Sequence, residues 1–307
     1  MIKQLIVIGG PTASGKTSLA IDLARYFGTE IISGDSRQFY HEMEIGNARP
    51  TPEELAAAKH HFIADRSVLA PLTAGRFAEE ALDRLTTIFS KHDQAVLVGG
   101  SGLYLRALCE GLDEFPEVTD QARTQVQKLV EGQGLPGLQA ELERLDPTYF
   151  ATVDQQNGRR LERALKVCYS ASQPYSSFLG NRPKRPFDCI YLRTHPPRDI
   201  LYQRINHRVD LMLAAGLEAE AKALLPHRAL PALQTVGYQE WWPYFSGDYS
   251  KDRAVELIKQ NSRRYAKRQV TWFGRGGQYA AVSDLDEALS VISDCQGRGA
   301  VPEKVKC

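Results

Sequence analysis

Short apolar runs alternate along the chain with longer segments in which apolar residues recur at helical spacing. The runs have the length and β-branched content of buried strands, and they cover residues 5–8, 30–33, 95–98, 189–192 and 279–282. Helical stretches separate most of them. This alternation predicts an α/β fold in which helices cover both faces of a parallel sheet.

The third and fourth predicted strands are too far apart in the chain for a single crossover helix. The segment between them holds three amphipathic helical runs, over residues 121–131, 137–145 and 158–169. We therefore expect an all-helical insertion lobe over residues 114–188. The core would consist of residues 1–113 and 189–295, closed by long helical segments over 198–225 and 251–269, and residues 296–307 would form a flexible tail.

The composition is that of an ordinary soluble globular protein. Of 307 residues, 43% are hydrophobic and 24% are charged, and no stretch approaches the ~20 apolar residues of a membrane span. The amino terminus runs directly into a predicted strand, so we expect no targeting segment. The five cysteines form no C-x-x-C pair, which indicates reduced thiols in a cytoplasmic protein. The adjacent His60 and His61 would point apart, which disfavours a shared metal ion.

Basic residues are clustered even though the net charge is only +1. Residues 259–275 contain six basic side chains and no acid. Two further clusters are Arg159, Arg160, Arg163 and Lys166, and Arg182, Lys184 and Arg185. Locally basic faces suit an anionic partner that docks on one side, although each cluster taken singly is equally well explained as a solvated helix face.

The most informative motif follows the first predicted strand. It is a complete G-x-x-x-x-G-K-[ST] phosphate loop, formed by Gly10, Pro11, Thr12, Ala13, Ser14, Gly15, Lys16 and Thr17. Backbone N–H groups and the positive end of the following helix cradle an anion, and the glycines allow its close approach. Lys16 adds a point charge for the terminal phosphates, and the Thr17 hydroxyl can hold Mg²⁺. The motif therefore predicts a site for a di- or triphosphate.

Two further strand ends carry candidate chemistry, because ligands of open α/β sheets lie outside the carboxyl ends of the strands. Asp35 follows the second predicted strand and is a candidate general base or magnesium ligand, with capping of the next turn as the structural alternative. The strand over 95–98 ends in Gly99-Gly100-Ser101, where a phosphate-loop NTPase would carry a magnesium-holding aspartate. This disfavours a motor or switch ATPase and predicts close backbone approach of a ligand, with the Ser101 hydroxyl as a donor.

Arginines and aromatic residues in the last third of the chain complete the candidates. Arg204 and Arg208 lie four residues apart on one predicted helix, and either could clamp a leaving pyrophosphate or form a surface salt bridge. The aromatic runs over 241–245 and 272–273 could stack on bases. Aromatic residues at such density are more often core, so we favour packing.

At these motifs the chain closely resembles the bacterial tRNA dimethylallyltransferases, also called tRNA isopentenylpyrophosphate transferases. The matching segments occur in family order and comprise the phosphate loop, Asp35-Ser36-Arg37-Gln38, 43–46, 60–62, 99–104, 159–165, 235–240 and 266–272. A phosphate loop alone would be weak evidence, but this series is specific. The resemblance implies a kinase-like P-loop core with a helical insertion that grips a tRNA anticodon stem-loop.

The resemblance also implies a reaction. The dimethylallyl group of dimethylallyl diphosphate would be transferred to N6 of the adenine at position 37, next to the anticodon, in tRNAs that read codons beginning with U. The phosphate loop would hold the donor's pyrophosphate instead of ATP. Lys16, Mg²⁺ on Thr17, and Arg208 would neutralise the leaving diphosphate, while Asp35 would accept a proton from N6 and orient it.

By resemblance, residues from both the core and the lobe would contact the tRNA. They are Asp35, Ser36, Arg37, Gln38, Ser101, Arg123, Arg159, Arg160, Leu161, Glu162 and Arg163. The chain departs from the family pattern at Ser101, where many members have threonine, and at Asn47 and Arg49, where threonine and lysine are commoner. No Cys/His finger follows the core, unlike in eukaryotic relatives, so the resemblance implies a bacterial, cytoplasmic protein. We also expect a monomer without a membrane partner.

Three alternatives stay open at this point. An adenylate isopentenyltransferase would use the same chemistry on free AMP, ADP or ATP, but it would not need the arginines of the insertion. A small-molecule kinase would fit the phosphate loop and Asp35, but it would leave the turn at 99–102 unexplained. A non-catalytic RNA-binding protein with a relic phosphate loop is disfavoured because Lys16, Thr17 and Asp35 are all intact.

Overall fold

The computed structural model describes residues 3–297, and these divide into two compact units. Unit 1 contains the segments up to Cys109 and from Arg185 onward, and unit 2 contains Glu110–Lys184. The tail expected over 296–307 is helical at residues 296 and 297, and its remainder lies outside the described residues. None of the helices described between residues 3 and 297 has the length and apolarity that a membrane crossing needs.

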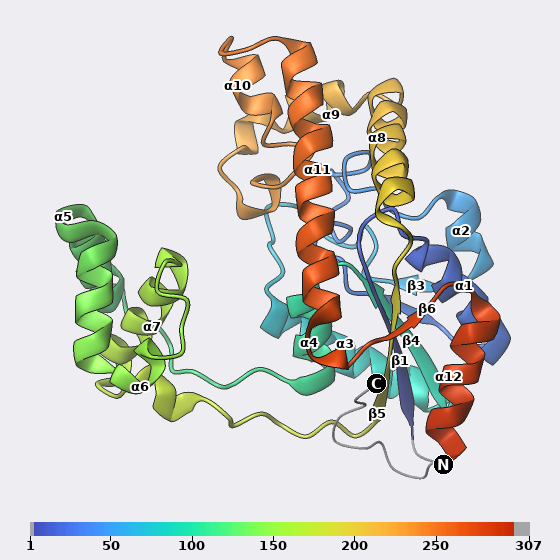
Figure 1. Ribbon diagram of the computed structural model, residues 1–307, viewed down its shortest axis with the longest axis horizontal. Coiled ribbons are helices and arrows are strands. Elements are labelled where there is room, and N and C mark those ends of the chain that lie inside the picture. Colours follow the sequence, from blue (N-terminus) through green and yellow to red (C-terminus); the bar gives the residue numbers. More distant parts are fainter. Residues whose placement is uncertain (1–2, 298–307) are drawn as a thin grey trace. The chain divides into compact units, whose positions relative to one another are not determined.

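Unit 1 is built on a sheet of six parallel strands in the order β3-β2-β4-β1-β5-β6 (Figure 1). The strands are β1 Gln4–Gly9, β2 Ile31–Ser33, β3 His60–His61, β4 Gln94–Gly99, β5 Asp188–Thr194 and β6 Ala280–Val282. Five of them lie where apolar runs predicted strands. The two-residue β3 carries no apolar run, and only its pairing with β2 makes it a strand.

Helices cover both faces of this sheet, as the alternating pattern predicted. The helices of unit 1 are α1 Lys16–Phe27, α2 Pro52–Ala57, α3 Ala74–Phe89, α4 Gly102–Glu110, α8 Arg198–Ala214, α9 Leu217–Leu224, α10 Trp241–Phe245, α11 Lys251–Gly274 and α12 Leu285–Gly297, with 3₁₀ turns η2 Leu225–His227, η3 Pro231–Leu233 and η4 Arg275–Gly277. Successive residues of β1 point to opposite faces of the sheet and contribute to two different hydrophobic cores. Leu5 and Val7 pack with α3 and α4, and Ile6 and Ile8 pack with α1 and α12.

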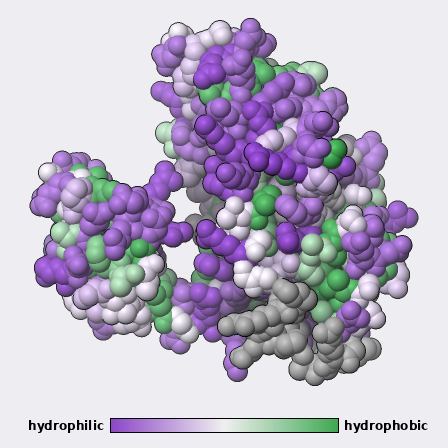
Figure 2. Space-filling model, in the orientation of Figure 1, coloured by the Kyte–Doolittle hydropathy of each residue, from purple (hydrophilic) through white to green (hydrophobic). Residues whose placement is uncertain are grey.

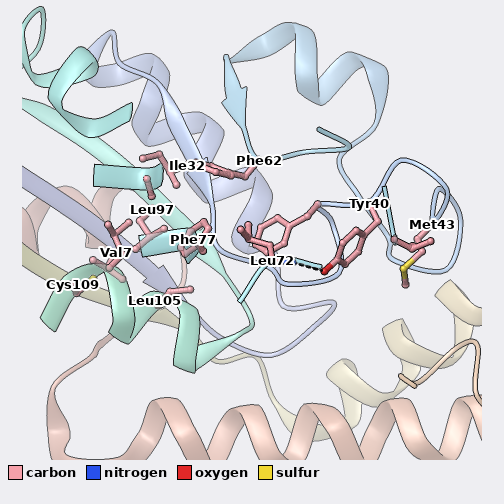
Figure 3. Close-up of a cluster of buried hydrophobic side chains, with 14 of the residues drawn as sticks. Val7, Ile32, Tyr40, Met43, Phe62, Leu72, Phe77, Leu97, Leu105 and Cys109 are labelled. Atoms are coloured by element: carbon pink, nitrogen blue, oxygen red, sulfur yellow. Dashed lines mark hydrogen bonds between the residues drawn. The ribbon is translucent and has the colours of Figure 1, made fainter. Parts of the chain in front are cut away.

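The first of these cores is large and rich in aromatic residues. Phe77 of α3 stacks on Phe39 with ring centroids 5.5 Å apart, and Leu97 of β4 lies in the same cluster (Figure 3). The Tyr40 hydroxyl accepts a hydrogen bond from the Leu72 N–H at 3.3 Å (Figure 3). This packing holds the loop that follows β2, which carries Asp35, against the edge of the sheet.

The helical segment predicted over 198–225 is two helices, α8 and α9. Gly216 lies between them with φ 101°, a left-handed conformation that glycine adopts without steric cost. Helical periodicity continues through the break, so the apolar pattern alone did not reveal it. The other long helix, α11, packs beside α8 and extends to Gly274 (Figure 1).

Unit 2 is all-helical and has a core of its own. It contains α5 Asp120–Leu145, α6 Pro147–Phe150, α7 Gly158–Ala171 and the 3₁₀ turn η1 Tyr175–Phe178. Gly134 interrupts α5 with φ 59° and ψ −149°, in the gap between the helical runs predicted over residues 121–131 and 137–145. The buried core residues come from α5 and α7 and are Val126, Leu138, Leu142, Leu161, Ala164 and Leu165.

Candidate active site

The phosphate loop joins β1 to α1 in a tightly bonded conformation. Gly10 has φ 148°, and a Cβ there would lie 2.7 Å from the Thr194 hydroxyl oxygen, so only glycine fits. Ala13 also adopts a left-handed conformation, with φ 63°. The Ser14 hydroxyl donates to the Pro11 carbonyl at 2.7 Å and lies 2.6 Å from the Thr194 hydroxyl. These bonds fix the shape of the anion cradle.

Lys16 is held inside the cradle as a desolvated cation. Its Nζ donates to the Pro11 carbonyl at 2.6 Å. Burial lowers the pKa of Lys16 to about 8; Arg208 and Arg37 act in the same direction, and Asp35 opposes them. A bound anion would relieve this destabilisation, so the site favours a negatively charged ligand next to Lys16.

Arg208 and Arg204 have different surroundings, although they share a helix. The Arg208 guanidinium donates to the Thr12 hydroxyl at 3.1 Å and lines the same cavity as Lys16. Burial lowers the pKa of Arg208 from its usual range, and Arg37 contributes to the same effect. Arg204 is exposed and does not line the cavity. Of the two arginines that the spacing put forward, Arg208 alone is therefore placed to clamp a phosphate.

The loop after β2 contributes an acid and a third cation. One Asp35 carboxylate oxygen accepts the Arg37 N–H at 3.2 Å, which is the capping role that the sequence left open, and the side chain also lines the cavity. The buried Arg37 guanidinium donates to the Val236 carbonyl at 3.2 Å and lies 5.0 Å from the centre of the Tyr265 ring. Its Nε is buried and has no hydrogen-bond partner among the described residues.

The glycine turn after β4 is connected to both of these loops. The Ser101 hydroxyl accepts the Ser36 N–H at 3.0 Å, and the two hydroxyls are 3.0 Å apart. From α11, the buried Gln269 accepts the Thr12 N–H at 2.9 Å and donates to the Gly100 carbonyl at 2.9 Å. The sequence reasoning did not single out Gln269. The sequence feature that could have indicated Gln269 is the presence of a polar residue on the apolar face of an amphipathic helix.

The phosphate loop and the loop after β2 line one cavity of about 520 Å³ with two chemically different parts. The phosphate loop, Lys16, Arg208 and Asp35 supply a polar part. Apolar side chains supply the other, namely Ile45, Ile63, Leu211 and Met212. The cavity therefore suits a ligand that combines a strongly anionic group with a small apolar group.

Two residues that line the cavity, Asn47 and Gln38, form hydrogen bonds that stabilise the loop after β2. The buried Asn47 donates to the Arg37 carbonyl at 3.2 Å and accepts the Arg49 N–H at 3.0 Å. Gln38 donates to the Ala48 carbonyl at 3.1 Å and accepts a hydrogen bond from the Ser33 hydroxyl at 3.2 Å. The departure from the family pattern at Asn47 therefore concerns the hydrogen bonds that shape this loop.

In unit 2 the arginines expected to bind RNA are exposed, and one other expectation is corrected. Arg123, Arg159, Arg160 and Arg163 face solvent. Leu161, expected with them, is fully buried in the core of unit 2, so its side chain packs there and cannot contact RNA. Glu162 forms an ion pair with Lys166 at 2.9 Å.

The aromatic runs are mainly core, as we favoured, with one exception. Trp241 and Phe273 are buried. Trp272 remains 37% exposed. A residue in such a run can therefore face solvent while its neighbour packs in the core.

Known proteins match this chain over most of its length. A family model described as IPP transferase matches residues 38–276. A tRNA dimethylallyltransferase from Christiangramia forsetii is 49% identical over 274 residues, which is 89% of this chain and 91% of the relative. The solved structure of a full-length tRNA isopentenylpyrophosphate transferase from Bacillus halodurans is 32% identical, covers 96% of each chain and has a TM-score of 0.70.

A more distant structure supports the fold alone. It is described as a eukaryotic dimethylallyltransferase acting on tRNA, it is 23% identical, and it has a TM-score of 0.82 over 99% of this chain and 81% of that one. Together with the family model and the close relatives, the parallel sheet, the phosphate loop and the helical insertion lead to one conclusion: the chain belongs to the IPP transferase family.

Proposed function

We propose that this protein transfers the dimethylallyl group of dimethylallyl diphosphate to N6 of the adenine at position 37 of tRNAs that read codons beginning with U. The observation that carries the proposal is the two-part cavity, in which a phosphate loop and an acid face the same space as a group of apolar side chains. The family to which the chain belongs supports the same reaction, because its named relatives are tRNA dimethylallyltransferases.

In this proposal the donor diphosphate occupies the phosphate loop. Backbone N–H groups of the loop, Lys16 and Arg208 hold its oxygens, and the apolar side of the cavity receives the five-carbon group. The C1–O bond of an allylic diphosphate can break with cation-like character. The negative charge that develops on the leaving diphosphate is then stabilised by donors that are already in place.

Asp35 acts on the acceptor. The adenine N6 is a weak nucleophile because its lone pair is delocalised into the ring. Asp35 lines the cavity, and its carboxylate can accept the N6 proton while N6 attacks C1. A hydrogen bond to the Ser101 hydroxyl, which accepts the Ser36 N–H, can orient the base. The adenine must leave its stack to reach the cavity, which is a normal requirement of enzymes that modify a base.

The residues present are compatible with Mg²⁺. Among residues 3–297 there is no group of three or more His, Cys, Asp or Glu side chains that could hold a metal ion. Magnesium, however, is commonly held by one or two protein oxygens together with substrate phosphates and water. The Thr17 hydroxyl lines the cavity and is such an oxygen. When bound, Mg²⁺ would neutralise charge on the leaving diphosphate.

The exposed arginines of unit 2, together with residues 35–38 and Ser101 of unit 1, are proposed to bind the anticodon stem-loop. Arg123, Arg159, Arg160 and Arg163 can hold phosphates around unstacked loop bases, which is how proteins usually recognise RNA loops. The cavity residues all come from unit 1. We propose that the protein acts as a monomer.

The test uses purified protein, Mg²⁺, dimethylallyl diphosphate and an unmodified anticodon stem-loop with three adenines after its second anticodon base. Mass spectrometry of the RNA should show one added dimethylallyl unit on the adenine beside the anticodon, and the Lys16→Ala variant should give none. A Lys91→Ala variant, changed at an exposed lysine outside the cavity, serves as the matched control.

A different product would overturn the proposal. Prenylation of free AMP without modification of the RNA would identify an adenylate isopentenyltransferase. Transfer of phosphate from ATP to a small molecule would identify a kinase. In both cases the exposed arginines of unit 2 would be solvated surface residues without a role in RNA binding.

A further inference from the structure

Glu220 of α9 is a partly buried acid whose carboxylate is bonded to other segments of unit 1. It differs in this from the side chains on the visible face over α11, which is coloured mainly hydrophilic (Figure 2). One carboxylate oxygen accepts the N–H groups of Glu44 at 2.8 Å and Ile45 at 2.7 Å. The other accepts the Gly46 N–H at 3.0 Å and the Tyr238 hydroxyl at 2.7 Å. These donors use the full acceptor capacity of a carboxylate.

The bonds of Glu220 join two segments that match the family pattern, residues 43–46 and 235–240, and that have no role in the reaction as described above. The two segments also pack directly on each other, because a Cβ on Gly46 would lie 2.5 Å from the Tyr238 ring carbon that carries the hydroxyl. Without the carboxylate, three successive backbone N–H groups would lose their acceptor. Gly46 is buried, so its N–H could not bond to water instead, and the loop would have to shift.

The middle residue of this loop, Ile45, belongs to the apolar part of the cavity. It lines the cavity together with Leu211 and Met212 of α8. Its Cδ1 would lie 3.9 Å from a Cβ on Gly216, which places it beside the break between α8 and α9. Leu211 is 57% exposed and so offers apolar surface that a ligand can cover. Because Glu220 lies just after the same break, one carboxylate ties the loop of Ile45 to the helices next to it.

We propose that Glu220 is a positioning residue for the donor. It holds Ile45 in place, so that the five-carbon group of dimethylallyl diphosphate meets an apolar surface that is already formed. A ligand that meets a preformed surface loses less free energy to the ordering of the site. Glu220 does not itself line the cavity, so it acts through Ile45. The inference rests on the proposed function and adds to it a residue that controls binding of the apolar group.

The test is a double-variant cycle with Glu220→Gln and Ile45→Ala. The amide of Glu220→Gln keeps the size of the side chain but presents a donor to groups that are themselves donors. Steady-state prenylation of the stem-loop gives KM for dimethylallyl diphosphate and KM for RNA. Inhibition by inorganic diphosphate, which has no apolar group, reports on the phosphate loop alone.

We expect each single variant to raise KM for the donor about tenfold, through lost contact with one apolar side chain. KM for RNA and the inhibition constant of inorganic diphosphate should stay within about twofold of the wild type, because neither ligand contacts Ile45 in the proposal. The double variant should also lose only about tenfold, since both changes remove the same contact.

Glu218→Gln is the matched control on the same helix. Glu218 also accepts a tyrosine hydroxyl, from Tyr244 at 3.1 Å, and it pairs with Lys251 at 2.6 Å, but it does not line the cavity. This variant should leave all the constants close to those of the wild type. If Glu220→Gln does not fold, Glu220→Asp replaces it in the cycle with the same expected effects, because it keeps the charge but withdraws it from the loop by one methylene group.

Three results would overturn the positioning role. The first is an unchanged KM for the donor in the Glu220 variant. The second is weakening of inorganic diphosphate as large as that of the donor, which would indicate general damage to the site. The third is a loss of about 100-fold in the double variant, which would show that Glu220 and Ile45 act independently. A wild type that modifies no RNA would instead overturn the proposed function.

Discussion

At the scale of single residues, the candidate site concentrates positive charge where water is scarce. Lys16, Arg37 and Arg208 line one cavity, in which the further cation Arg49 is already paired with Glu44 at 2.7 Å. The other acids that line it are Asp35 and Glu54. Such a group of cations is unfavourable without a ligand, because each cation loses hydration and repels the others. A diphosphate would offset both costs. The arrangement therefore implies that the charge on Lys16 affects donor binding.

Replacing Asp35 by asparagine should separate chemistry from RNA binding. The amide keeps the size of the side chain and its bond to the Arg37 N–H, but it cannot accept the N6 proton. We expect single-turnover prenylation to fall about 100-fold or more, and the affinity for the stem-loop to change by less than threefold. Asp83→Asn, at an exposed position on α3, is the control. A rate within a few-fold of the wild type would show that Asp35 is not the base.

Donor binding should weaken as the pH rises through about 8. Burial lowers the pKa of Lys16 to about 8, so the ammonium group is charged below this pH and neutral above it. A bound diphosphate favours the charged form, so donor binding near pH 8 should be accompanied by proton uptake. Titration calorimetry in buffers of different ionisation enthalpy measures this uptake. In Lys16→Arg, whose guanidinium stays charged, the alkaline loss should disappear; if it persisted unchanged, Lys16 would not be its cause.

At the scale of elements, α11 determines how the loops of the site meet. Gln269 is bonded to the phosphate loop through Thr12 and to the turn after β4 through Gly100. The phosphate loop and the turn after β4 are thus joined by one side chain from a helix far away in the sequence. Glycine at position 100 is part of this arrangement, since a Cβ there would lie 2.3 Å from the Gln269 amide nitrogen.

Gly100→Ala should therefore damage both stability and activity. The added methyl group must displace Gln269, which breaks its bonds to both loops. We expect a loss of about 1–3 kcal/mol in the free energy of unfolding and a loss of at least tenfold in kcat/KM for RNA. Denaturant unfolding and steady-state kinetics measure the two effects.

Gly132→Ala provides the matched control for that change. A Cβ at Gly132 has nothing within 4 Å, and its position on α5 favours alanine over glycine. It should leave activity unchanged and unfolding free energy equal or higher. If Gly100→Ala were as harmless as Gly132→Ala, Gln269 would not connect the two loops.

At the scale of the whole molecule, each unit has its own core. Unit 1 encloses cations in its cavity, whereas unit 2 exposes arginines to solvent. The cavity and its cations belong to unit 1, and a separate set of exposed arginines belongs to unit 2. Where unit 2 leaves unit 1, the Arg185 guanidinium donates to the carbonyls of Ala107 and Leu108, at 2.7 Å each. The two chain ends of unit 1 are thus bonded to each other, so changes in unit 2 should not disturb the donor site.

Arg163→Ala should accordingly weaken RNA binding and leave donor binding intact. Removal of one phosphate contact should lower the slope of log affinity against log salt by about 0.7–0.9. The control is Arg144→Ala in the same unit, because Arg144 is exposed but already paired with Glu141 at 2.7 Å. Measurements of stem-loop affinity at several salt concentrations distinguish the two variants. An Arg163→Ala variant that binds RNA like the wild type at every salt concentration would contradict this role for unit 2.

Sequence patterns were most informative where a local rule applies. The spacing of glycines and Lys16 predicted the phosphate loop, and apolar runs predicted five of the six strands described in unit 1. Patterns failed where partners distant in the sequence decide the outcome. β3 is a strand only because it pairs with β2, and α8 and α9 are separated by the backbone of Gly216, which interrupts an otherwise continuous periodicity.

The sequence by itself therefore determined the fold class, the anion cradle and the family, because these depend on periodicity, on backbone freedom at glycine and on motifs that are read locally. Tertiary structure alone decided which residues share a site. It selected Arg208 over Arg204, buried Leu161 and brought Gln269 between two loops. The physical reason is that burial and hydrogen-bond partners arise from packing between distant segments, which determines the solvation and pKa of each group.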